Sequence, residues 1–363
     1  MNFFFVIKPE FMPLAKAELN EKIKLVSEVY SLDMPQLKRS RAGFELETDL
    51  KFIELLQFYL RIPSKILLRV KTFNARDPGR LFQRLKTISW KDYLKNADYS
   101  LRVSTRASAL NFSKKVEAVA KEAIETYFKD SPAKKWKDSF KHEVNINIFE
   151  DEVTVSIDMG GEPLYKRGYK EKHLAALRED FASAMLQQAD FQKYDSIFDP
   201  MAGSGTFLLE AHYFYRPNVH REYAIRSLPH FSVTSLKKLV PLKEIKQKYL
   251  GNDISKAHSK LLTDTFEKHG LTASEVFNED ISSWDFSITN QSLLLLSNVP
   301  YNHRIKSDFY SSYKKKYAPF FAKFSNSRLL VADDEANKCV ELRKSPSLID
   351  FSNNGTKVRL LSI

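Results

Sequence analysis

Hydrophobic and polar residues alternate along much of the chain up to residue 158, between stretches in which hydrophobic residues recur every three to four positions. The period of two predicts strands, and the longer period predicts helices. Strands are expected at residues 3–7, 43–47, 66–73, 99–105, 144–149 and 153–158. Helices are expected at residues 12–23, 50–60 and 113–128. The pattern therefore favours two small α/β modules, residues 1–60 and 61–158.

The pattern changes after Gly160, Gly161 and Pro163, which mark a break. A helix is expected at residues 174–188, so that residues 159–190 form a connector. Strands then alternate with helices: strands at residues 196–199, 249–253, 273–277, 293–297 and 328–332, and helices at 206–213 and 257–269. Such alternation implies right-handed crossovers and a parallel sheet, here in a domain of residues 191–363. A polar, basic insertion at residues 214–248 belongs to no expected strand.

The composition is that of an ordinary folded chain, since 43% of the residues are hydrophobic. Its length of 363 residues exceeds what one hydrophobic core usually organises. The longest apolar runs, residues 3–7 and 293–296, are far shorter than the roughly 20 residues that span a bilayer. The single cysteine, Cys339, excludes an intramolecular disulfide and a cysteine-cluster metal site. We therefore expect a cytoplasmic protein without a membrane segment.

The net charge of +12 is concentrated in one segment. Residues 61–141 contain 20 basic and 8 acidic residues, so this segment carries the whole excess. A solvated basic surface is one interpretation, but the clustering favours a face that binds a polyanion, most simply nucleic acid. Within the segment, lysines flank an aromatic residue, a combination that can hold a phosphate and stack a base. These candidate RNA-binding residues are Lys134, Lys135, Trp136 and Lys137.

A glycine-containing turn is expected where the first strand of the C-terminal sheet ends and a helix begins. Its candidate ligand-binding residues are Asp199, Pro200, Gly203, Ser204, Gly205 and Thr206. Gly203 and Gly205 allow a ligand to approach the backbone, and the free amides of the helix start face it. The turn lacks the lysine of a phosphate-binding loop, and Asp199 would repel a phosphate but suit an ammonium group. A purely structural tight turn is the alternative.

Acidic residues also follow the next two expected strands. Asp253 stands where a carboxylate can accept both ribose hydroxyls, and Asp280 could accept a hydrogen bond from an adenine amino group. Each residue alone is better explained as a helix cap or a surface acid. Together, at the carboxyl ends of neighbouring strands, they predict a nucleoside pocket.

The fourth strand ends in Asn298, Val299, Pro300 and Tyr301. This sequence resembles the Asn-Pro-Pro-Tyr motif of S-adenosylmethionine-dependent amino-methyltransferases, and the turn at residues 199–206 resembles their first motif. Further similarities lie at residues 164–169, 177–179, 221–224 and 354–355. With them the chain resembles the bacterial THUMP-domain methyltransferases that act on guanine N2 of large-subunit ribosomal RNA. That family has a ferredoxin-like module and a THUMP domain before a Rossmann-like class I methyltransferase domain.

The resemblance implies S-adenosylmethionine as cofactor, RNA as partner, and a role for each residue of the fourth-strand motif. The Asn298 side-chain oxygen and the Val299 carbonyl would accept the two hydrogens of a base amine, and Tyr301 would stack on the extruded base. Val299 replaces the usual proline, so activity is expected to be lowered or lost. Transfer-RNA guanine, DNA adenine N6 and a non-catalytic RNA-binding role remain open. The histidines have no metal-like spacing, so no metal is expected.

Overall fold

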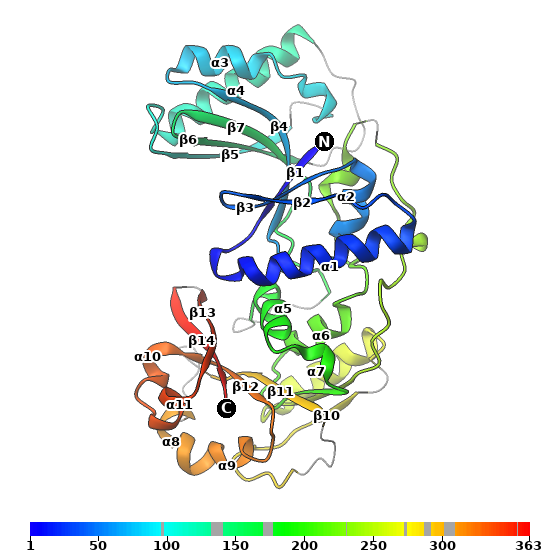
Figure 1. The fold of residues 1–363 in the computed structure, drawn as a ribbon, viewed down its shortest axis with the longest axis vertical. Coiled ribbons are helices and arrows are strands. Elements are labelled where there is room, and N and C mark those ends of the chain that lie inside the picture. Colours follow the sequence, from blue (N-terminus) through cyan, green and yellow to red (C-terminus); the bar gives the residue numbers. More distant parts are fainter. Residues whose placement is uncertain are drawn as a thin grey trace. The chain divides into compact units, whose positions relative to one another are not determined.

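The computed structural model describes residues 1–95, 98–131, 141–169, 177–229, 231–271, 274–286, 292–300, 309–353 and 355–363 (Figure 1). The chain forms two compact units, and each unit includes a segment from the part of the sequence that mainly builds the other. Unit 1 consists of Met1–Pro9, Glu18–Lys166 and Val219–Leu239. Unit 2 consists of Glu10–Ala17, Arg167–Asn218 and Val240–Ile363.

Unit 1 contains a seven-stranded sheet with the order β2-β3-β1-β4-β7-β6-β5. Its strands are β1 (Asn2–Val6), β2 (Leu37–Ser40), β3 (Gly43–Glu47), β4 (Lys65–Asn74), β5 (Tyr99–Arg106), β6 (His142–Phe149) and β7 (Glu152–Asp158). Only the β5–β6 pair is parallel. The six strands expected in this region are confirmed, whereas β2 was not expected. Because β4 pairs with both β1 and β7, one sheet continues across residue 60.

The α-helices of this region include two whose starts are capped by aspartate side chains. The α-helices are α1 (Met12–Tyr30), α2 (Leu50–Gln57), α3 (Pro78–Lys86) and α4 (Ser113–Asp130). The carboxylates of Asp49 and Asp77 accept hydrogen bonds from backbone amides three residues later, at 2.7 and 2.8 Å, at the starts of α2 and α3. Figure 1 shows α3 and α4 along one face of the sheet. The sequence pattern did not reveal α3, in which Leu81 and Leu85 are buried.

Unit 2 contains a second seven-stranded sheet with the order β10-β9-β8-β11-β12-β14-β13. Its strands are β8 (Ser196–Asp199), β9 (Lys248–Asn252), β10 (Glu275–Phe277), β11 (Leu293–Asn298), β12 (Ser327–Ala332), β13 (Ser347–Asn353) and β14 (Thr356–Ser362). The five strands from β10 to β12 are mutually parallel, as expected. The later strand β14 lies next to β12 and is antiparallel to both β12 and β13. A tight turn at Gly355, with φ of +85°, reverses the chain there.

The longer helices of unit 2 lie close to their predicted positions. They are α5 (Glu179–Gln188), α6 (Thr206–Tyr213) and α7 (Lys256–Lys268). Shorter helices come after them: α8 (Phe309–Ser312), the π-helix Tyr313–Tyr317, α9 (Ala318–Phe321), α10 (Asp333–Ala336) and α11 (Val340–Lys344). α5 begins later than expected, because Arg178 is extended and the acidic Glu179 and Asp180 stand in the first turn. The core of this sheet gathers around Phe198, Leu295 and Leu329.

The insertion at residues 214–248 has no strand in its described part before Lys248, as expected. Its middle is anchored within unit 1 by Arg221, which donates to the carbonyl oxygens of Gly160, Glu162 and Pro163 at 2.6–2.8 Å. The fully buried Glu54 of α2 accepts hydrogen bonds from Arg226 and from the Thr234 amide at 2.6 and 2.9 Å. Residues 219–239 of the insertion are thus a structural part of unit 1.

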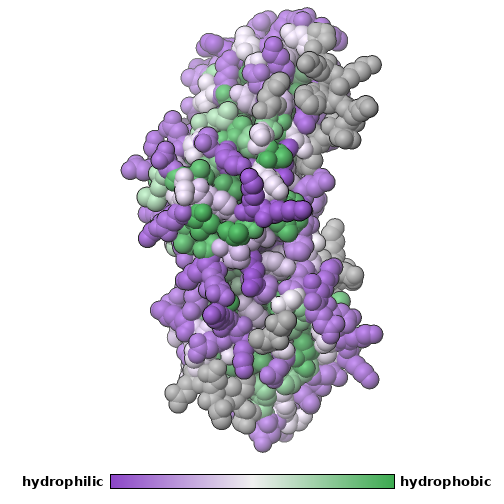
Figure 2. All heavy atoms as spheres, turned by 90° about the vertical axis from the view of Figure 1, so that its right-hand side faces the viewer, coloured by the Kyte–Doolittle hydropathy of each residue, from purple (hydrophilic) through white to green (hydrophobic). Residues whose placement is uncertain are grey.

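Figure 2 shows one face of the molecule, on which hydrophilic side chains are widespread and hydrophobic ones form separate patches. Within the described ranges, no helix combines the length and the apolar character that crossing a bilayer requires.

Candidate active site

The turn after β8 has the backbone geometry that its glycines allow. Gly203 and Gly205 have φ of +52° and +73°, and α6 begins at the next residue, Thr206. A Cβ at Gly203 would have no described atom within 4 Å, so this part of the backbone is open to a ligand. A Cβ at Gly205 would lie 2.5 Å from a Leu262 methyl of α7, so this glycine allows close helix packing. Ser204 and Thr206 are buried in the same turn.

Asp199 lies at the end of β8 and is buried. Its Oδ1 accepts hydrogen bonds from the Ser297 hydroxyl at 2.8 Å and from the Met201 amide at 3.1 Å. Burial raises the pKa of this carboxyl to about 7, and the Asp253 carboxylate adds to the increase, whereas the two hydrogen bonds oppose it. The Ser297 contact was not anticipated from the sequence. It joins the turn to β11, which carries the expected amine-binding motif.

Asp253 follows β9 and contacts the glycine turn directly. Its Oδ2 accepts a hydrogen bond from the Gly203 amide at 3.0 Å, and its Oδ1 accepts one from the Ser255 amide at 2.8 Å. His258 Nδ1 lies 3.4 Å from the same Oδ1. The side chain of Asp253 keeps 13% of its surface exposed. The structure therefore places the predicted ribose-binding carboxylate of Asp253 next to Gly203, whose backbone is open to a ligand.

The residue before Asp253 was overlooked in the sequence. Asn252 is buried, and its Nδ2 donates to the carbonyl oxygens of Pro200 and Glu279, both at 3.0 Å. Its Oδ1 accepts from the Glu279 amide at 2.9 Å. One side chain thereby holds the turns after β8 and β10 together. The sequence signal that could have revealed Asn252 is a side-chain amide at the end of a buried strand, next to a predicted ligand residue.

Asp280, the third predicted carboxylate, lies on the exposed loop after β10. Its Oδ1 accepts a hydrogen bond from the Ser282 amide at 2.9 Å, which fixes the loop locally. Through the neighbouring Glu279 backbone, this loop is tied to Asn252. The turns after β8, β9 and β10 thus form one connected edge, and the contact of Asp280 with adenine stays a prediction.

Asn298 ends β11, which lies between β8 and β12. Its Oδ1 is buried and accepts no hydrogen bond from the part of the chain that the structure describes. Val299 is buried in the core, and its amide donates to the Leu330 carbonyl at 3.2 Å. Pro300 is half-buried. Tyr301 lies outside the described residues, as do Lys134, Lys135, Trp136 and Lys137 of the predicted RNA-binding segment.

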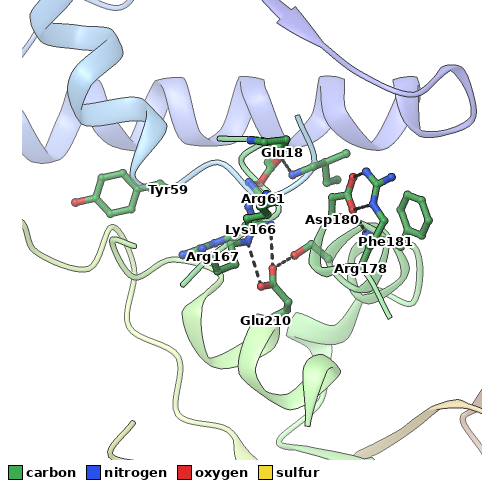
Figure 3. Close-up of polar contacts among 12 residues, drawn as sticks. Glu18, Tyr59, Arg61, Lys166, Arg167, Arg178, Asp180, Phe181 and Glu210 are labelled. Carbon is green, nitrogen blue, oxygen red and sulfur yellow. Dashed lines mark hydrogen bonds and ion pairs between the residues drawn. The ribbon is translucent and has the colours of Figure 1, made fainter. Parts of the chain in front are cut away.

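A buried ion pair, also not anticipated, anchors the helix that starts at the glycine turn (Figure 3). Glu210 of α6 accepts from Arg167 Nε and Nη2, both at 3.2 Å, and from the Ser183 hydroxyl of α5. Arg167 and Glu210 are almost fully inaccessible, so the charges compensate each other away from solvent. This contact fixes α6 and with it the amides that face the turn.

The described histidines in the core have structural partners. His269 contacts the Tyr213 hydroxyl and the Tyr169 carbonyl, both at 2.7 Å, and His212 contacts Arg216. Among the described residues, no group of three or more histidine, cysteine, aspartate or glutamate side chains could hold a metal ion.

Unit 2 combines five parallel strands, a reversed strand next to the last of them, and a glycine turn after the central strand β8. This is the arrangement of the Rossmann-like class I methyltransferases, the class that uses S-adenosylmethionine. Residues 167–346 match the family model described as "RMKL-like, methyltransferase domain". These residues are therefore similar to the methyltransferase domain of the RMKL-like family.

Two similar curated proteins are both named "Ribosomal RNA large subunit methyltransferase K/L". The protein of Syntrophotalea carbinolica is 27% identical over 196 residues, which are 52% of this chain and 28% of that protein. The protein of Marinomonas sp. is 26% identical over 307 residues, which are 77% of this chain and 42% of that protein. The chain thus spans less than half the length of these relatives.

A solved structure with the same fold is that of SMU.472, determined as a complex with SAH. It superposes with a TM-score of 0.78 at 20% identity, covering 100% of this chain and 97% of that one. At this identity the likeness concerns the fold, and it extends over both units of the chain.

Proposed function

We propose that this protein transfers a methyl group from S-adenosylmethionine to the exocyclic N2 amine of a guanine in structured RNA, with large-subunit ribosomal RNA as the first candidate. The class of the C-terminal domain supports the donor. The names of the two curated relatives and the basic segment at residues 61–141 support the acceptor. Residues 1–60, 61–158, 159–190 and 191–363 then serve as ferredoxin-like module, THUMP-like RNA-binding domain, connector and catalytic domain.

The edge formed by the turns after β8, β9 and β10 fits a nucleoside with an ammonium-bearing tail. S-adenosylmethionine supplies an electrophilic methyl group when it is bound. The Gly203 and Ser255 amides each occupy one lone pair of the Asp253 carboxylate. Its remaining lone pairs would accept hydrogen bonds from the ribose hydroxyls. Asp199 would provide the negative charge opposite the ammonium, and Asp280 would accept from the adenine amine. Pro200, Ser204, Gly205 and Thr206 shape the turn.

The observation that carries the proposed reaction is the buried Asn298 Oδ1, which has no partner among the described residues. An unsatisfied buried acceptor costs about 1–3 kcal/mol, so its retention is explained if a target group satisfies it. The lone pair of a base amine is delocalised into the ring. By accepting one amine hydrogen, Asn298 would favour a pyramidal nitrogen, and the Val299 carbonyl would accept the other. No strong general base is required, because catalysis rests on positioning.

The test is the replacement Asn298→Ala. We expect methyl transfer to fall by about a hundredfold or more, which is the scale for losing one preorganised polar contact. Affinity for S-adenosylmethionine should remain nearly unchanged, because the contact is with the amine. The assay is transfer of labelled methyl to ribosomal RNA from cells that lack this protein, followed by mass spectrometry of the nucleosides.

The matched control is Asn326→Ala, which removes an asparagine just before β12, at the opposite end of the sheet. This variant should keep full turnover. Full turnover of Asn298→Ala would refute amine positioning, and a methylated nucleoside other than N2-methylguanosine would refute the base assignment. Cofactor binding without transfer to any RNA would instead indicate a non-catalytic RNA-binding role.

A further inference from the structure

The sheet of unit 1 has two unlike faces in the region of β4, β7, β6 and β5. One face carries the buried side chains Val144, Ile146, Ile148, Val153, Val155 and Ile157. The helices α3 and α4 lie along one face of these strands, and α4 packs on β5 (Figure 1). The other face is polar. Since strand side chains alternate between faces, the polar residues form a continuous surface.

The pairing of the strands arranges this surface, which we call the polar sheet face, in three cross-strand rows. The rows are Arg102–Asn145–Ser156–Arg69, Ser104–Asn147–Thr154–Thr72 and Arg106–Phe149–Glu152–Asn74. Arg102, Ser104, Arg106 and Asn147 are exposed. Asn147 Nδ2 donates to the Ser104 hydroxyl at 2.7 Å, so the middle row is held in place.

The acidic side chains of this face are largely engaged with lysine or arginine. Glu143 and Asp158, at the end next to the first row, both pair with Lys65. Glu45 of β3, which is separated from β4 by β1, pairs with Arg69 at 3.5 Å. Glu152, in the third row, is the remaining acid and is separated from Arg106 by β6.

By contrast, no hydrogen bond or ion pair joins the side chain of Arg102 or Arg106 to another described residue. A third guanidinium, that of Arg41, lies over the Phe149 ring at 3.7 Å, in the row of Arg106. Arg41 is 3.8 Å from Glu150, but both side chains are more than 60% exposed, so this pair is weak. The end of the face formed by β5 and β6 is therefore positively charged.

We propose that the polar sheet face binds a single-stranded segment of the RNA substrate, with Arg102 and Arg106 contacting phosphates. This inference rests on the proposed function, because it assigns the docking surface of that RNA. These two arginines, which have no partner among the described residues, stand four residues apart, roughly 13 Å along one strand, and match a polyanion that runs along β5. The asparagine and serine side chains between them can bond to ribose and bases, and an open sheet is a known platform for unpaired nucleotides. An apolar protein partner would leave these groups unsatisfied.

The experiment compares the double variant Arg102→Gln/Arg106→Gln with Arg80→Gln/Arg84→Gln in the full chain. Arg80 and Arg84 are exposed on α3, so the control removes the same charge from the helical side of the unit. The probe is a fluorescent oligouridylate, which contains no guanine, and its affinity is measured over a range of salt concentrations. Methyl transfer to ribosomal RNA is measured in parallel.

For the β5 variant we expect the logarithmic salt slope to fall by about 1.4, the value for two phosphates of a single strand. The α3 control should retain the wild-type slope, and both variants should keep the wild-type melting temperature. Equal slopes for the β5 variant and wild type would overturn the proposed face. If wild-type protein still methylates RNA in that case, the proposed function stands. If wild-type protein neither binds nor methylates RNA, both are refuted. If the salt slope of the β5 variant falls only when the probe is an RNA duplex, the assignment of a single-stranded segment is also refuted.

Discussion

Replacing Asp199 with asparagine should stabilise the cofactor-free protein and weaken its binding of S-adenosylmethionine. Asparagine keeps the shape of the side chain, and its oxygen can still accept from Ser297 and the Met201 amide. It cannot ionise, however. In the wild-type protein, burial raises the pKa of Asp199 from 3.8 to about 7, so ionisation at neutral pH opposes folding.

The expected size follows from this raised pKa. A tenfold change in the acid dissociation constant corresponds to about 1.36 kcal/mol, so a rise of the pKa from 3.8 to about 7 amounts to about 4 kcal/mol. Between these pH values the native carboxyl keeps its proton while the unfolded one has released it. The native state therefore binds more protons, and the free energy of unfolding falls as pH rises from about 4 to 7. Above about pH 7 the carboxyl is ionised in both the native and the unfolded state, so the stability that wild type loses through Asp199 no longer changes with pH.

The assay is the melting temperature of wild type and Asp199→Asn at a series of pH values from 4 to 8, without cofactor. The two proteins should be alike near pH 4 and should diverge up to about pH 7. The matched control, Asp195→Asn, changes an exposed carboxylate just before β8 and should show no such divergence. Calorimetry should show wild-type affinity for S-adenosylmethionine rising with pH through about 7, and this rise should be absent in Asp199→Asn. An Asp199→Asn variant less stable than wild type at pH 8 would refute the reasoning.

Three further changes test the site and its support. Asp253→Ala should weaken S-adenosylmethionine binding by about 1–3 kcal/mol in calorimetry, because ribose donors lose their acceptor; unchanged affinity would contradict the assignment. Phe11→Ala should lower the free energy of unfolding by about 3–5 kcal/mol, because the centroid of its ring lies 5.4 Å from that of Phe181 in unit 2. The control is Phe112→Ala, which removes an exposed ring. Equal melting curves for Phe11→Ala and wild type would count against this packing. Val299→Pro should destabilise the protein by about 1–3 kcal/mol and lower turnover, because proline cannot donate to the Leu330 carbonyl; an active, equally stable variant would show that this hydrogen bond is dispensable.

Much of the local structure was determined by the sequence itself. The strands Gly43–Glu47 and Ser196–Asp199 and the helix Thr206–Tyr213 lie where the hydrophobic pattern places them, because each element buries one face or is buried throughout. The glycine turn was likewise readable, since positive φ and close helix packing both require glycine. β2, α3 and β13 were not predicted, and β2, with four residues, is too short to give a periodic signal.

Tertiary structure alone decided which distant residues meet. Phe11 packs with Phe181 and Phe351 in unit 2, and Arg221 bonds to the carbonyls that follow β7 in unit 1. Each unit therefore needs a segment that sequence order assigns to the other, so cutting the chain near residue 158 would expose apolar core. The link from Ser297 to Asp199 is equally invisible in the sequence, as is the burial of the Asn298 oxygen away from any partner in the described ranges. Local patterns report burial and period, whereas a hydrogen-bond partner is set by how the strands are ordered and how far each side chain reaches.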